Sequence, residues 1–182
     1  VAVLDSNFWL STHVVTITIG YAGCIAAGIV GHVYLLQALR LPGGHPHLRG
    51  AARAIYGLLA FALIFSFLGT MLGGVWADQS WGRFWGWDPK ENGALLIVLW
   101  CAILLHARMA GMIDLLGLTA GSVLGVIVVL FAWIGVNLLG VGLHSYGFTS
   151  GLALGLWLAV AAELAFVAIT VPLIARRARR AV

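Results

Sequence analysis

Residues 81–108 read "WGRFWGWDPKENGALLIVLWCAILLHAR" and contain the feature that decides the fold. Three tryptophans precede one short charged stretch, and an apolar run ending in a histidine and an arginine follows it. The run approaches the roughly 20 residues that a membrane-spanning helix needs. Residues 94–109 are therefore predicted to span a membrane, with the tryptophans outside the span.

Four more apolar segments surround this one. They cover residues 10–39, 54–76, 115–139 and 151–174. With 62% hydrophobic and 9% charged residues, the 182-residue chain is too apolar for a soluble domain. The predicted fold is all-α: one membrane domain over residues 1–182, built as a polytopic bundle of about five transmembrane helices.

The basic residues predict the orientation of the bundle. Eight of the ten fall on one predicted side, and short cytoplasmic loops collect Lys and Arg. The eight are Arg40, Arg49, Arg53, Arg108, Arg176, Arg177, Arg179 and Arg180. The N-terminus is therefore predicted outside and the C-terminus inside. The net charge of +4 then reflects topology and contact with the lipid bilayer, and no nucleic-acid partner is expected.

Two histidines are predicted at the outer surface. His13 opens the first span, and His144 lies in the external loop 140–150 after the fourth. The external tryptophan-rich loop 76–93 lies on the same side. Together these segments would supply two imidazoles and an aromatic wall, which a bis-histidine haem site requires. Each histidine could instead be a simple hydrogen-bonding group at the membrane interface.

The other histidines are predicted deeper or on the inner side. His106 lies about 12 residues into its span, or about 18 Å deep at 1.5 Å per residue, in the inner half of the bilayer. Intramembrane histidines usually face a bundle interior or a ligand, so His106 is either a ligand or satisfied by a neighbouring helix. His32 approaches the inner surface, and His45 and His47 belong to the inner loop.

The tryptophan-rich loop has two interpretations. Tryptophans collect at membrane interfaces, yet half of the eight crowd into one short window here, which favours a platform for a flat cofactor. The next residues also form a helix start: Asp88 as N-cap, Pro89 in the first turn and Glu91 completing a capping box. Arg83 and Lys90 could meet two carboxylates, such as the propionates of a porphyrin.

The motif "WGRFWGWDPKE" resembles the WWD motif of the haem-handling proteins of cytochrome c maturation. "FWLSTHVVTITIGYAG" and "VNLLGVGLHSYGF" make the chain similar to CcsA-type proteins, the membrane component of the system II cytochrome c synthase. A WWD match alone would leave the CcmC and CcmF branches open. The resemblance covers essentially the whole chain.

The resemblance implies a set of site residues. His13 and His144 would be the axial ligands of an external haem b. The WWD residues that would lie against this haem are Trp81, Trp85, Trp87 and Asp88. His106 would bind an intramembrane haem, with a partner histidine from a CcsB-like subunit or fused N-terminal region. The chain would then be the C-terminal part of a synthase in the cell inner (cytoplasmic) membrane, with the thylakoid membrane as the alternative.

The resemblance also implies an activity. Haem would be exported and attached through thioethers to an apocytochrome c that presents Cys-X-X-Cys-His, which makes the chain a component of a holocytochrome c synthase, or haem lyase. Thiol-reducing membrane proteins would be partners, because both thiols must be reduced. No catalytic residue is assigned beyond haem positioning. The alternatives are a haem chaperone or exporter without lyase activity, a haem-carrying electron-transfer subunit, and a transporter that uses His106 and Glu163.

Overall fold

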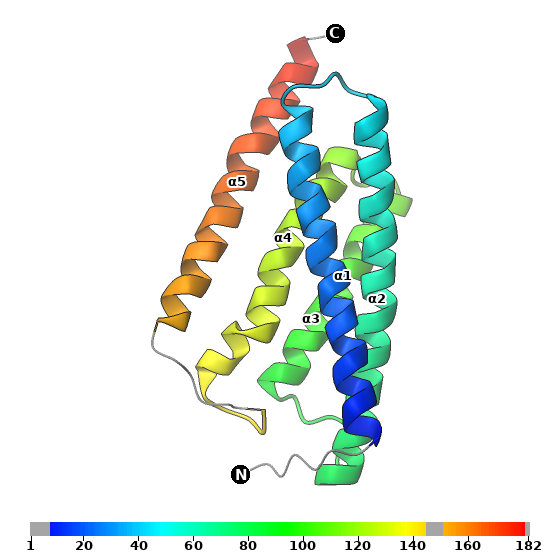
Figure 1. Cartoon of the computed structure of the whole chain (residues 1–182), viewed down its shortest axis with the longest axis vertical. Coiled ribbons are helices and arrows are strands. Elements are labelled where there is room, and N and C mark those ends of the chain that lie inside the picture. The colour runs from blue at the N-terminus through cyan, green and yellow to red at the C-terminus, as the bar shows by residue number, and fades with distance from the viewer. Residues whose placement is uncertain (1–7, 145–150, 181–182) are drawn as a thin grey trace.

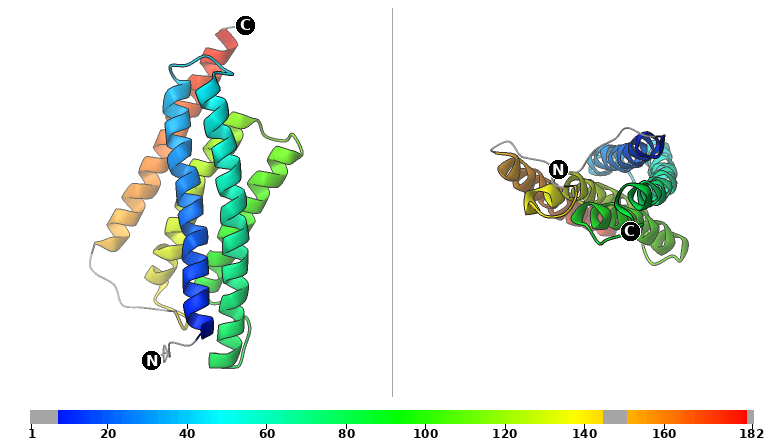
Figure 2. Two further views of the ribbon diagram at one scale, coloured as in Figure 1. Left: turned by 45° about the vertical axis from the view of Figure 1, so that its right-hand side comes forward. Right: turned by 90° about the horizontal axis from the view of Figure 1, so that it is seen from below.

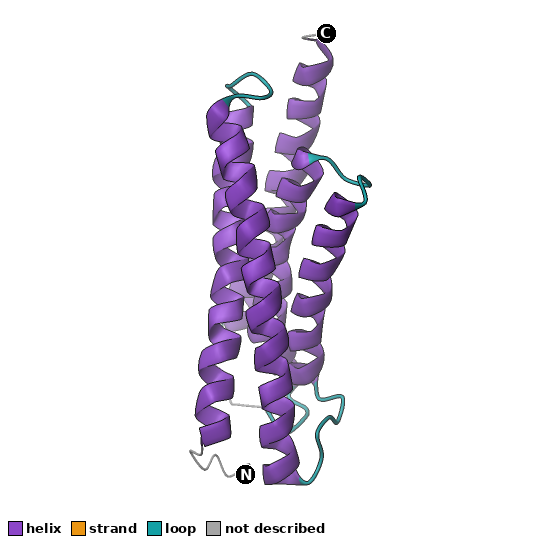
Figure 3. Cartoon of the chain, turned by 90° about the vertical axis from the view of Figure 1, so that its right-hand side faces the viewer, coloured by secondary structure: helices purple, strands orange, loops and turns teal. Residues whose placement is uncertain are grey.

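The structure, a computed structural model, describes residues 8–144 and 151–180, and over them its regular secondary structure is all helix, joined by short loops. Figure 3 shows this by secondary structure. The helices are α1 (Phe8–Ala38), α2 (Pro46–Trp81), α3 (Pro89–Met109), α4 (Leu115–Trp133), the short 3-10 helix η1 (Gly135–Leu139) and α5 (Leu152–Arg180). Five helical segments, η1 continuing α4, are long and apolar enough to cross a membrane. The prediction of an all-α bundle with five spans is confirmed.

The second helix is longer than its apolar segment. It continues past Trp76 to Trp81, and Gly82 ends it in the left-handed conformation at φ 69°, where its N–H donates to the Asp78 carbonyl. Glycine adopts this conformation without strain, so it fixes the end of the helix. The predicted loop 76–93 is therefore helical at both ends, and only residues 82–88 connect α2 to α3.

The five long helices run alternately up and down (Figure 1). Helix α1 packs mainly against α2 and α4, and α3 packs against α4 and α2. Helix α5 contacts chiefly α4, and its first half stands apart from α1 and α2 (Figure 2). The far end of α5 is tied to α1, because Arg177 donates to the backbone carbonyls of Leu39 and Arg40.

Small residues bring α1 and α2 close together. A Cβ on Gly69 would lie 2.7 Å from the backbone of Ile17, and a Cβ on Gly23 would lie 3.4 Å from the backbone of Ala62. Contacts this short are only possible where one partner lacks a side chain, as in many membrane helix pairs. The close approach places His13, near the start of α1, directly against the last turns of α2.

The basic residues lie at the two opposite ends of the helix bundle, eight at one end and two at the other. The eight arginines that predict the inner side lie where α1, α3 and α5 end and α2 begins (top of Figure 1). Arg83 and Lys90 lie at the opposite end, with His13 and His144. This arrangement matches the pattern on which the orientation was predicted; which end faces the cytoplasm stays a prediction.

Candidate functional site

A cavity of about 320 Å³ lies at the end of the bundle opposite the arginine-rich end. It is lined by residues of α1, α2, the α2–α3 connection, α3 and α4, and by His144. Most of the lining is apolar, including Tyr21, Phe84 and Trp133, and its polar members include His13 and His144. The structure thus brings together the two histidines and the tryptophan-rich segment that were predicted to share one face.

His13 is held in one tautomer by α2. Its Nδ1 lies 2.7 Å from the carbonyl oxygen of Gly69. A carbonyl only accepts hydrogen bonds, so Nδ1 must carry the hydrogen and donate it, which leaves the lone pair on Nε2. Gly73, one turn further along α2, gives the ring its room: a Cβ there would lie 2.6 Å from Cε1 of His13.

His144 is held by a buried carboxylate. Its Nδ1 lies 3.2 Å from Oδ1 of Asp88, and the Trp81 ring packs edge-on against it with centroids 5.0 Å apart. A carboxylate that accepts from Nδ1 leaves the lone pair on Nε2, as at His13. Two chain segments therefore present imidazoles to one cavity in the same tautomer, the form that binds a metal through Nε2.

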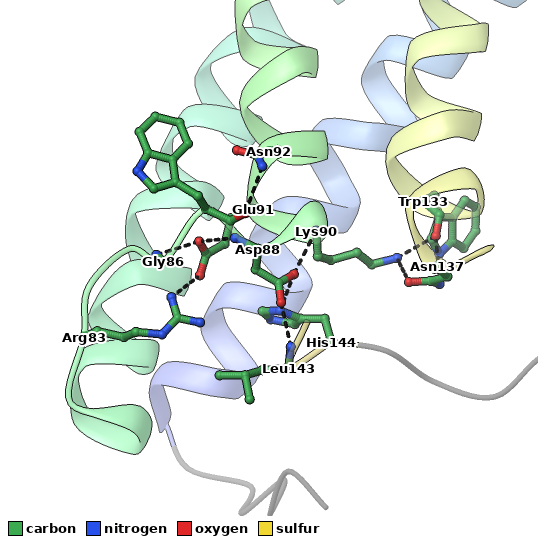
Figure 4. A network of polar contacts seen from close by, with 11 residues as sticks. Arg83, Gly86, Asp88, Lys90, Glu91, Asn92, Trp133, Asn137, Leu143 and His144 are labelled. Carbon is green, nitrogen blue, oxygen red and sulfur yellow. Dashed lines mark hydrogen bonds and ion pairs between the residues drawn. The ribbon is translucent and has the colours of Figure 1, made fainter. Parts of the chain in front are cut away.

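Asp88 joins three parts of the site. It is only 5% exposed, and it caps α3 by accepting from the N–H of Lys90 at 2.9 Å, as predicted. Its Oδ2 accepts from the N–H of Leu143 at 2.6 Å (Figure 4). Gly142, at φ 90°, lets the backbone pass this close, since a Cβ there would lie 2.8 Å from Cγ of Asp88. The carboxylate therefore fixes the segment that carries His144 onto the start of α3.

Glu91 braces the connection before α3. Its Oε2 accepts from the N–H groups of Gly86 and Asp88 at 2.8 and 3.1 Å, and its Oε1 pairs with Arg83 at 3.3 Å. The predicted capping box is confirmed. Glu91 and Asp88 together hold residues 82–88 in one shape.

The two cations near the site are used within the protein. Arg83 pairs with Glu91, and Nζ of Lys90 donates to the Trp133 carbonyl at 2.5 Å and to Oδ1 of Asn137 at 3.0 Å (Figure 4). Lys90 thereby ties α3 to the end of α4 and to η1. In this structure both cations have partners within the protein; that they meet the carboxylates of a ligand stays a prediction.

The three predicted tryptophans take different positions. Trp85 lines the cavity, whereas Trp81 packs behind His144 and against Trp76. Trp87 is 70% exposed and meets Trp85 edge-on, with centroids 5.9 Å apart. Its φ of 59° is unusual for a bulky residue and marks strain of about 1–3 kcal/mol that its surroundings must maintain. The tryptophans therefore do not form one flat platform.

His106 lies apart from this cavity. It sits on α3 three residues before the helix ends, on the same exposed stripe as Leu99 and Ile103. Its Nδ1 lies 2.7 Å from the carbonyl of Ala102, one turn earlier, so Nε2 keeps its lone pair. The ring therefore faces outward from the described part of the bundle.

One polar pair was not predicted. Nε2 of His32 lies 3.0 Å from Oε2 of Glu163 and joins α1 to α5, while Nδ1 of His32 lies 2.8 Å from the Gly28 carbonyl. Phe166 stacks on the same ring at 4.7 Å. Nε2 of His32 is within ion-pair distance of the carboxyl group, but Oε2 of Glu163 makes no hydrogen bond of acceptable geometry within the described residues. The sequence marked Glu163 as unusual but gave no partner for it.

Gly69 and Gly73, which hold and accommodate the His13 ring, were also not predicted from the sequence. The Gly69 carbonyl and Gly73 act on His13 across more than fifty residues of chain, and the only signal was the general richness of the spans in glycine. Ser145 and Tyr146, which contribute to the family resemblance, lie outside the described residues, as does the rest of the predicted loop up to residue 150.

The comparisons with known proteins agree on one family. The model of the family described as cytochrome C assembly protein matches residues 1–144, which contain every residue predicted for the site. Proteins named cytochrome c biogenesis protein CcsA are similar to this chain. The one from Chlamydomonas reinhardtii is 36% identical over 152 residues, which are 81% of this chain and 43% of that protein. The one from Phaseolus vulgaris is 40% identical over 96 residues, 52% and 29% of the two chains. The chain spans less than half the length of these relatives.

Proposed function

Because the chain belongs to the cytochrome c assembly family, as a CcsA-type membrane protein of cytochrome c biogenesis, we propose that it holds haem b between His13 and His144 and presents it to an apocytochrome c. The observation that carries this proposal is the pair of imidazoles in one cavity, each with its Nδ1 hydrogen donated and its Nε2 free to bind iron.

The residues present fit a haem in chemistry. Haem iron accepts two axial imidazoles, and the tautomers of His13 and His144 are those that coordination needs. The cavity of about 320 Å³ lies at the lower end of the range of roughly 300–1,000 Å³ that small-molecule sites occupy. Trp85 and Phe84 give it aromatic surface of the kind that a porphyrin face packs against.

In this proposal Asp88 and Trp81 act through His144. A metal-binding histidine usually donates its other N–H to a carboxylate or carbonyl, which fixes the ring and makes it a stronger ligand. Asp88 has that role for His144, and the Gly69 carbonyl has it for His13. Trp81 supports the His144 ring from the side. Asp88 and Trp81 are thus positioning residues. Trp87 is exposed and would be available to contact a partner protein.

The proposed chemistry is a haem lyase reaction. Haem supplies two vinyl groups and an iron that accepts axial ligands. Each reduced thiol of the apocytochrome adds across one vinyl group: its sulfur bonds to one carbon and a proton goes to the other, so the addition itself consumes no electrons. The chain contributes by holding the haem in place, so that the thiols of a bound apocytochrome lie within reach of the vinyl groups. The histidine of Cys-X-X-Cys-His replaces one axial imidazole and releases the product.

His106 fits a second haem site shared with another segment. Its ring faces outward from the described helices and its Nε2 is free, so a second imidazole would come from a CcsB-like subunit or fused region. Haem would pass from this site to the cavity at His13 and His144.

Thiol-reducing proteins would act on the same side of the membrane as that cavity. The proposed location is the cell inner membrane; the algal and plant relatives keep the thylakoid membrane as the alternative.

Coexpression with an apocytochrome tests this function. The chain is produced with its CcsB-like portion and with an apocytochrome that carries either Cys-X-X-Cys-His or Ser-X-X-Ser-His, and covalent haem is measured in the apocytochrome after denaturation. We expect covalent haem only with the cysteines. The covalent haem should be lost in His13→Ala and His144→Ala but not in the control His47→Ala, which changes an exposed histidine in the first turn of α2 at the opposite end of the bundle. Stable haem in the membrane protein without covalent product would contradict the lyase role and support a haem chaperone.

A further inference from the structure

A second cavity, of about 630 Å³, opens at the arginine-rich end of the bundle. It lies between the first turns of α2, the end of α3 and the first turns of α4. Three arginines line it: Arg49 and Arg53 from α2, and Arg108 from α3. Their neighbours in the lining are mostly apolar, among them Met109 and Leu118. The cavity therefore combines cationic groups with an apolar wall.

The positive charge in this cavity is not balanced by the protein. Over residues 8–144 and 151–180, none of the three arginines has a carboxylate within 4.0 Å. The nearest acidic residue in sequence, Asp114, is used to cap α4 by accepting from the N–H of Gly117 at 2.8 Å. Guanidinium groups gathered in one cavity repel one another, so a bound anion would stabilise the arrangement.

Two of the three guanidiniums are also free of hydrogen bonds. Arg108 donates to the Ile113 carbonyl at 3.1 Å and so closes the turn between α3 and α4. Arg49 and Arg53 make no side-chain hydrogen bond within the described part of the chain. Each of them therefore offers its full set of N–H donors, a planar fork that matches the oxygens of a phosphate.

An apolar stripe leads away from the arginines toward the middle of the membrane span. Along α2, Tyr56 lines the cavity, and the exposed Ile64 and Phe67 follow it on the same face. Residues eight and eleven positions apart lie on one side of a helix. A ligand with an anionic head among the arginines and a hydrocarbon tail would have apolar surface to follow along this face.

We propose that this cavity binds the phosphate headgroup of an anionic phospholipid. The charge, the free donors and the place at the end of the spans fit a lipid headgroup, and the exposed stripe on α2 fits its acyl chain. A small soluble anion would not use the apolar wall. The site is distinct from the cavity at His13 and His144, which lies at the opposite end of the bundle, and does not depend on the proposed haem function.

Two matched double variants test the proposal in the full chain. R49Q/R53Q removes two charges from the cavity and leaves Arg108 and its turn intact. R176Q/R180Q removes two charges from the same end of the bundle but outside the cavity. Each protein is placed in nanodiscs of phosphatidylcholine with one part in ten of phosphatidylglycerol. The lipid that stays bound is then identified by native mass spectrometry.

Wild type and R176Q/R180Q are expected to retain phosphatidylglycerol preferentially, and R49Q/R53Q is expected to lose this preference by about tenfold or more. Equal loss in both variants would overturn the proposal, because surface charge alone would explain the enrichment. Retention in R49Q/R53Q would also overturn it. If that variant kept its lipid but lost absorbance from bound haem, the cavity would serve the haem carboxylates instead, and the lipid proposal would fail.

Discussion

Replacing Gly73 by alanine should displace His13 while leaving the rest of the bundle in place. The new Cβ would lie 2.6 Å from Cε1 and 2.8 Å from Nδ1 of the His13 ring. Ordinary carbon contacts are about 3.5–4.0 Å, so the ring must move by about 1 Å or the two helices must separate. The hydrogen bond from His13 to Gly69 is 2.7 Å long, and such a bond has only about 0.5 Å of slack before it weakens.

The energetic cost follows from the same geometry. Overpacking a close contact costs about 1–3 kcal/mol, and alanine in a helix interior regains about 0.5–1 kcal/mol relative to glycine. Gly57, also on α2, is the matched control, because a Cβ there would meet nothing within 4 Å. We therefore expect Gly73→Ala to lower the thermal midpoint and Gly57→Ala to leave it equal or higher.

A double variant tests whether the side chain that Gly73→Ala adds acts on His13. In His13→Ala the ring is gone, so adding Gly73→Ala should cost little, and the two changes should be strongly non-additive in thermal stability. With haem bound, Gly73→Ala alone should weaken the low-spin spectrum, and added imidazole should restore it. Strictly additive stabilities, or a wild-type spectrum in Gly73→Ala, would refute the inferred contact and its role in orienting the ring.

Two other substitutions test the buried polar contacts. Asp88→Ala removes a helix cap and leaves the N–H of Leu143 without its acceptor, so it should destabilise the protein by about 2–4 kcal/mol, measured by chemical denaturation. Asp88→Asn keeps one acceptor oxygen and should cost less; an equal cost for the two variants would contradict the role of Asp88 as an acceptor. Glu163→Leu should cost about 1–3 kcal/mol because it leaves His32 without its polar partner, and adding His32→Leu should recover part of that loss. Additive costs would contradict a direct interaction between the two side chains.

Local signals in the sequence were sufficient for the fold. Five apolar segments gave the five spans, because the bilayer sets the length of each. The capping box from Asp88 to Glu91 could be predicted from four consecutive residues. The end of α2 was missed, because the amphipathic last turns up to Trp81 are less apolar than the span and hydropathy alone stops at Trp76.

The site was only partly predictable. Segment order and depth placed His13 and His144 at one end of the bundle, where the structure has them. Their partners could not be found in this way, since Asp88 and the Gly69 carbonyl act across loops or between helices whose register the sequence does not specify. The same holds for His32 and Glu163, which meet only because α5 packs near α1.

The visible spectrum of the haem-loaded protein tests the central claim most directly. The chain is purified with the proposed CcsB-like portion, as wild type and as His13→Ala and His144→Ala, and spectra are recorded with and without imidazole. We predict a low-spin, bis-imidazole spectrum in wild type, its loss or conversion in each variant, and its recovery when imidazole is added. Wild-type spectra in both variants would contradict the assignment of His13 and His144 as the axial pair.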